Sequence, residues 1–182
     1  MKNRLFVSLD IPNDIVDQII KFRDSINPNQ KLKWESREKL HLTIKFIGDV
    51  ETSVTRKISE ELQFVEQFNS IKCSFINFGF FYRDNNPSIL WAGLKTDDSL
   101  NSLVTQINNR LENFSIPIET KKFNPHITLL RIKNTTGNDF VNSFKNFTFE
   151  PIEFSTNSVT LFKSELGREG SKYFKIKNYK LK

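Results

Sequence analysis

The chain has 182 residues, a net charge of +6 and a sequence pI near 9.4, which suits one compact domain with an anionic partner such as a nucleic acid or a phosphorylated metabolite. A single Cys73 excludes an internal disulfide and a thiolate metal cage. No run is apolar enough to span a membrane, and Asp10 and Pro12 break the opening apolar run too early for a signal peptide, so a soluble cytoplasmic protein is expected.

The first half of the chain predicts strands that alternate with helices. The predicted elements are a strand over 4–10, a helix over 15–25, a strand over 40–47 and a helix over 51–68. The helices are indicated by apolar residues spaced by three and four, and the strands by apolar residues that alternate with polar ones. The segment Asn27-Pro28-Asn29 ends the first helix, and Gly48 closes the second strand.

The second half repeats this order. Strands over 71–81 and 88–94, a helix over 97–111, a strand over 126–133, a helix over 137–147, and strands over 149–154, 158–163 and 172–180 are predicted. The repeat indicates an internal duplication. We therefore expect an α+β fold over residues 1–182, a single bilobal domain with pseudo-twofold symmetry and a central cleft.

The two histidines of the chain open the same four-residue pattern. The patterns are His41-Leu42-Thr43-Ile44 and His126-Ile127-Thr128-Leu129, each on a predicted strand. Side chains on a strand alternate between its faces, so each His shares a face with its Thr while the apolar residues enter the core. A lone strand His is more commonly structural, but the matched pair indicates one site in which the duplicated lobes set the histidines opposite each other.

Two imidazoles and two hydroxyls suit the hydrolysis of a cyclic phosphodiester. This reaction needs a base that takes a proton from water and an acid that protonates the leaving ribose oxygen. Imidazole serves either role near neutral pH. The Thr hydroxyls could hold the non-bridging phosphate oxygens, and a nearby Lys or Arg could neutralise the charge on them.

Other catalytic classes lack their motifs in this sequence. There is no H-E-x-x-H, and two histidines with one distant cysteine fall short of a zinc site. The chain also lacks the glycine-rich loops that hold nucleotide phosphates and the G-x-S-x-G turn of serine hydrolases. We therefore expect no cofactor and no metal.

The sequence resembles the two-histidine (2H) phosphoesterases, and among them the bacterial and archaeal RNA 2′,3′-cyclic phosphodiesterases, often labelled 2′–5′ RNA ligases. The resemblance covers almost the whole chain. It is carried by segments that begin at Arg4, Lys33, Leu40, Leu90, Phe123, Leu161 and Gly170, including RLFVSL, LHLTIKFIG, LWAGL and FNPHITLLR.

This resemblance implies a bilobal α+β fold that converts RNA 2′,3′-cyclic phosphate ends to 2′-phosphomonoesters without a metal. It also implies that His41 donates a proton to the leaving 3′ oxygen and that His126 activates water. Thr43 and Thr128 then bind the phosphate. The residues by themselves leave open which histidine is the acid.

Three further residues are candidate substrate contacts. Arg131 resembles an arginine that follows the second motif in the family, although strict alternation places it on the face opposite His126 unless a bulge intervenes. Phe46 and Tyr173 could stack on a base, as could Trp34, but an aromatic residue on a strand more commonly packs in the core. Ser171-Lys172 stand where the family has a small residue and Arg, which leaves the C-terminal RNA contacts open.

Other readings of the same residues remain. The enzyme could prefer 2′–5′ linked oligonucleotides or cyclic nucleotides, or run the reaction backwards as a 2′–5′ RNA ligase. The chain could instead be a noncatalytic RNA-binding module whose histidines only contact phosphate, with strongly salt-dependent binding and no turnover. No segment marks an interface, so a monomer is expected.

Overall fold

The computed structural model describes residues 2–28, 32–133, 136–168 and 170–182. Its main elements are β1 (Lys2–Leu9), α1 (Asn13–Ile26), β2 (Leu42–Glu51), α2 (Thr52–Glu61), β3 (Ile71–Arg83), β4 (Asn86–Thr96), α3 (Asp98–Glu112), β5 (His126–Arg131), α4 (Asn138–Lys145), β6 (Ile152–Thr156), β7 (Ser158–Gly167) and β8 (Gly170–Lys180). Within the described ranges, none of the helices has the length and apolar character needed to cross a membrane.

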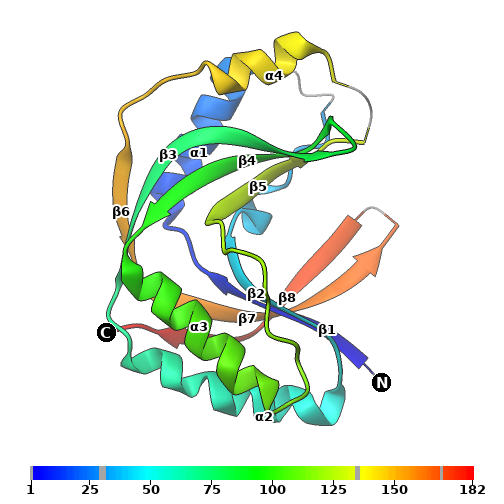
Figure 1. The fold of residues 1–182 in the computed structure, drawn as a ribbon, viewed down its shortest axis with the longest axis vertical. Helices are drawn as coiled ribbons and strands as arrows, with labels where there is room; N and C mark the ends of the chain where they lie inside the picture. The colour runs from blue at the N-terminus through cyan, green and yellow to red at the C-terminus, as the bar shows by residue number, and fades with distance from the viewer. Residues whose placement is uncertain (1, 29–31, 134–135, 169) are drawn as a thin grey trace.

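All eight strands form one antiparallel sheet in the order β6-β3-β4-β5-β2-β1-β7-β8. The sheet is strongly curved, and its two halves meet in the middle at β5 and β2 (Figure 1). There Leu42 of one motif pairs with Ile127 of the other. Counted inward from the two edges of the sheet, the strands of the two halves correspond in order, so that β4 corresponds to β1 and β5 to β2. The predicted duplicated, pseudo-symmetric α+β fold is confirmed.

The helices of this fold cover the sheet crosswise. Helix α1 follows β1 but packs with Phe22 against Phe75 of β3 and against Phe149, at ring separations of 6.3 and 4.9 Å. Helix α4 also contacts β3, whereas α2 and α3 contact β2 in the other half (Figure 1). Each half of the sheet is therefore covered by helices from both halves of the sequence, which ties the two lobes to a shared core.

Several element boundaries differ from those predicted. The helix predicted over 51–68 ends at Glu61 and tightens into a 3₁₀ helix over Leu62–Gln67. The strand predicted over 40–47 begins only at Leu42, because a 3₁₀ turn over Arg37–Lys39 precedes it. Strands β3 and β4 extend beyond their predicted ends because Asp84 and Asn85 adopt φ of 49° and 61°, which makes a tight two-residue turn.

Phe144 of α4 ties that helix to the sheet and gives a test of the core. Its side chain is fully buried, with ring centroids 5.4 Å from Phe78 and 6.2 Å from Trp34. Phe144→Ala is expected to lower the free energy of unfolding by about 3–5 kcal/mol in urea titrations, because it leaves a cavity. Phe174→Ala, at a side chain that is 47% exposed, should cost less than about 0.5 kcal/mol. Equal losses would contradict this packing.

Candidate active site

Both histidine motifs line a single pocket of about 500 Å³ in the middle of the sheet. His41, immediately before β2, and Thr43 of β2 line it on one side, and His126 and Thr128 of β5 line it on the other. The remaining lining residues are Arg4, Leu5, Phe6, Glu35, Lys39, Phe46, Gly48, Ile89, Arg131, Ser164, Leu166, Ser171 and Tyr173. The structure thus brings together both histidines, both threonines, Arg131, Phe46 and Tyr173, whereas Trp34 is not among the lining residues.

A β-bulge follows each motif threonine. The pairing of β2 with β1 skips Ile44, and the pairing of β5 with β4 skips Leu129. Each bulge shifts the alternation by one residue, so Phe46 and Arg131 face the pocket although each lies five residues after its histidine. The two halves therefore place equivalent His and Thr residues at the pocket, but Phe46 on one side corresponds to Arg131 on the other.

His41 lies in an aromatic environment immediately before β2. Its ring stacks on Phe6 with centroids 5.1 Å apart, and the ring of Tyr173 lies at a steep angle to it with centroids 5.5 Å apart. Within the described part of the chain, the buried Nδ1 has no hydrogen-bond partner. Burial lowers the pKa of His41 from 6.5 to about 4, because the imidazolium is poorly solvated among these rings. Without a bound anion, His41 is therefore neutral at physiological pH.

His126 is held in a defined tautomer. Its Nδ1 lies 2.7 Å from the carbonyl oxygen of Asn124, which can only accept, so Nδ1 donates. Nε2 of the neutral ring is then a hydrogen-bond acceptor. Burial lowers the pKa of His126, and the charge of Arg131 lowers it further, while the bond to Asn124 opposes both effects. A neutral imidazole with a free Nε2 is the form that a general base requires.

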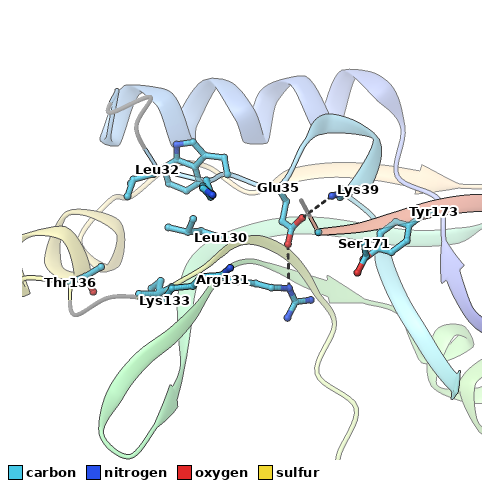
Figure 2. A pocket seen from close by; sticks show the side chains of 13 residues that line it. Leu32, Glu35, Lys39, Leu130, Arg131, Lys133, Thr136, Ser171 and Tyr173 are labelled. Carbon is cyan, nitrogen blue, oxygen red and sulfur yellow. Dashed lines mark hydrogen bonds and ion pairs between the residues drawn. The ribbon is translucent and has the colours of Figure 1, made fainter. Parts of the chain in front are cut away.

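Glu35 and Lys39, which sequence reasoning missed, form a charged cluster with the predicted Arg131 beside the histidines. Glu35 accepts a hydrogen bond from Arg131 Nε at 3.2 Å and lies 3.9 Å from Lys39 Nζ (Figure 2). The backbone N–H of Glu35 donates to the carbonyl oxygen of Leu129, the bulge residue, at 2.8 Å. The signal in the sequence for Glu35 and Lys39 was their position a few places before His41.

Two of the aromatic candidates have different surroundings. Tyr173 lines the pocket beside His41. Trp34 instead packs between Arg23, whose guanidinium lies 4.9 Å from its ring centroid, and Phe144, so its ring is partly occupied by protein contacts. No group of three or more His, Cys, Asp or Glu side chains among the described residues is arranged to hold a metal ion.

Gly79 of β3 pairs with Trp91 of β4, whose ring lies close to His126. A Cβ on Gly79 would lie 2.2 Å from the Trp91 ring, which is 6.4 Å from His126. Gly79→Ala is therefore expected to displace the indole and with it the imidazole, lowering any kcat that depends on His126 about 100-fold. Gly137→Ala serves as the control, because an added Cβ there would have no atom of the described residues within 4 Å. A folded Gly79→Ala with full activity would contradict this role of the Trp91 ring.

A sequence model of LigT-like phosphoesterases matches the chain over residues 9–91 and 94–173, so that each match holds one motif. The RNA 2′,3′-cyclic phosphodiesterase of Thermotoga maritima is 28% identical, over 93% of this chain and 91% of its own. That of Methanocaldococcus jannaschii is 29% identical, over 97% and 99%. That of Escherichia coli K12 is 25% identical, over 98% and 96%.

Solved structures share the fold. The crystal structure of E. coli LigT complexed with 3′-AMP superposes with a TM-score of 0.78 at 22% identity, covering 100% of this chain and 99% of that one. The crystal structure of TT0787 of Thermus thermophilus superposes with a TM-score of 0.81 at 20% identity, covering 97% of each chain. The duplicated motifs, their common pocket and these matches show that the chain belongs to the LigT-like phosphoesterases of the 2H phosphoesterase superfamily.

Proposed function

We propose that this protein hydrolyses the 2′,3′-cyclic phosphate ends of RNA to 2′-phosphomonoesters. The proposal is carried by one observation, the convergence of both His-x-Thr pairs on a single pocket. An acid and a base are required on opposite sides of the phosphorus atom, and pseudo-symmetric halves of a sheet supply one group from each side. The curated relatives that carry the name RNA 2′,3′-cyclic phosphodiesterase support the choice of substrate.

In the proposed reaction, His126 is the base and His41 is the acid. Water attacks phosphorus as His126 Nε2 takes its proton, and the bond between phosphorus and the 3′ oxygen breaks as His41 donates a proton to that oxygen. The phosphate remains on the 2′ oxygen. Support for His126 as the base comes from its bond to Asn124, which fixes Nε2 as the acceptor. The assignment of His41 as the acid follows from the family resemblance.

The other lining residues bind the substrate in this proposal. Thr43 and Thr128 donate hydrogen bonds to the non-bridging phosphate oxygens, and Arg131 stabilises the charge that develops on them. Phe46, whose side chain is 70% exposed at the pocket, stacks on the terminal nucleobase. Tyr173 contacts the ribose beside His41.

In this scheme the side chains of the protein supply every catalytic group. The two histidines make both proton transfers, and the threonines with Arg131 stabilise the charge, so no step in the scheme calls for a metal or a cofactor. We propose that residues 1–182 act as one bilobal catalytic unit and as a monomer.

A short RNA with a 2′,3′-cyclic phosphate end tests the proposal when it is incubated with the protein in the presence of a chelator. The expected product is a 2′-phosphate end, identified by its resistance to an enzyme that removes 3′-phosphates. Salt-dependent binding with no product would favour the noncatalytic RNA-binding module. A product joined through a new 2′–5′ linkage would favour the ligase reading, in which a 5′-hydroxyl replaces water.

A further inference from the structure

A second hollow of about 630 Å³ adjoins the active-site pocket. The two cavities share the side chains of Glu35, Lys39, Arg131, Ser171 and Tyr173, so they lie side by side. Figure 2 shows Glu35, Lys39 and Arg131 in the middle of the lining, with Tyr173 and Ser171 on one side and Leu32, Lys133 and Thr136 on the other. Each volume falls within the range of about 300–1,000 Å³ that is typical of ligand sites.

The lining of the second hollow combines apolar and basic groups. Leu32, Leu130 and Ile132 supply apolar surface. Lys33 and Lys133 are exposed at the hollow and form no ion pair with a described carboxylate. Apolar surface that covers a base or a ribose, together with free cations for a phosphodiester, is the combination that binds a nucleotide of a single strand.

The adjacency of the two cavities suits the direction in which the RNA strand continues. A cyclic phosphate occupies the 3′ end of an RNA, so the strand continues from the terminal nucleotide only through its 5′ phosphate. The residues shared by the two cavities include Arg131 and Lys39, whose positive charges offset the carboxylate of Glu35. A phosphodiester can therefore pass from one hollow to the next without facing an uncompensated negative charge.

We propose that the second hollow binds the nucleotide that precedes the cyclic-phosphate end, and that the substrate is an oligoribonucleotide end rather than a cyclic mononucleotide. This inference rests on the proposed hydrolase function. Lys33 and Lys133 contact the phosphodiester on the 5′ side of that preceding nucleotide.

The test compares three substrates that differ only in length: a 2′,3′-cyclic mononucleotide, a dinucleotide and a trinucleotide with the same cyclic end. The value of kcat/KM should rise at least about tenfold on addition of the second nucleotide, because that nucleotide fills the second hollow. Substrates should carry a 5′-phosphate, so that the dinucleotide presents a phosphate to the two lysines.

The variant K33A/K133A separates the subsite from the catalytic centre. It should lower kcat/KM on the 5′-phosphorylated dinucleotide and trinucleotide roughly tenfold, since two exposed charge pairs each contribute up to about a factor of five. Activity on the cyclic mononucleotide should change less than about twofold. The control K57A/K95A removes the same charge from residues that line neither hollow and should leave all three substrates unaffected.

The outcomes distinguish the two proposals. Equal kcat/KM values for mononucleotide and oligonucleotides, or equal losses on all substrates in K33A/K133A, would overturn the subsite while leaving the hydrolase intact. The same loss in K57A/K95A would also overturn it, by attributing the effect to net charge. No turnover of any cyclic substrate by the wild-type protein would overturn both the hydrolase and the subsite.

Discussion

Replacing either motif histidine with alanine is expected to lower kcat/KM on a cyclic-phosphate RNA by about 10²–10⁴-fold, the usual contribution of a positioned acid or base. His41→Ala removes the proposed donor to the 3′ oxygen, and His126→Ala removes the acceptor of the water proton. Both side chains line the same pocket. Initial rates at substrate concentrations well below KM, measured beside thermal unfolding, check the prediction.

The double variant gives a further check on this pair. Because the acid and the base act in one step, the loss in the double variant should be much smaller than the product of the two single losses. Thr160→Ala, at a buried hydroxyl on β7 that bonds to Asp10, changes a residue outside the pocket and should retain the turnover of the wild type. Full activity in either folded histidine variant would rule out the pair.

The pH dependence of kcat/KM is expected to be bell-shaped with its maximum below pH 6.5. Burial lowers the pKa values of both histidines below 6.5, that of His41 to about 4. On the acidic side of the maximum, kcat/KM falls as pH drops through the pKa of His126, because the base becomes protonated. On the alkaline side of the maximum, kcat/KM falls as pH rises through the pKa of His41, because the donor loses its proton. At pH 7 about one free molecule in a thousand carries that proton.

Substrate binding should move this profile upward. An anionic phosphate beside His41 favours the imidazolium, so the maximum of kcat should lie at higher pH than that of kcat/KM. Tyr173, the other titratable ring beside His41, has its pKa raised by burial and stays neutral over this range. Rates from pH 4 to 9 at constant ionic strength measure both profiles. A kcat/KM maximum at or above pH 7 would contradict the burial of the two histidines.

The sequence predicted the duplication and the four motif side chains because these depend on local patterns. Alternation along a strand places His and Thr on one face, and the structure confirms that Leu42 and Ile127 enter the core. The repeated order of strands and helices predicted the pseudo-symmetric sheet. Both features depend on short segments of a few residues, in which the spacing of apolar residues indicates the local secondary structure.

The features that depend on distant contacts were not predictable. Nothing in the residues around Ile44 or Leu129 marks a bulge, which depends on the register with β1 and β4. The bulges decide that Phe46 and Arg131 face the pocket. Glu35 acquires its position from a backbone bond to Leu129, far along the chain. Such tertiary pairings override the simple period of two on which the sequence reasoning relied.

The most direct test of the divided histidine roles is a cyclic substrate in which sulfur replaces the bridging 3′ oxygen. Sulfur leaves without protonation, so the acid becomes dispensable while the base does not. We predict that His41→Ala hydrolyses this substrate within about tenfold of the wild-type rate and that His126→Ala stays impaired by about 10²-fold or more. Rescue of His126→Ala, or equal impairment of both variants, would contradict the division of roles.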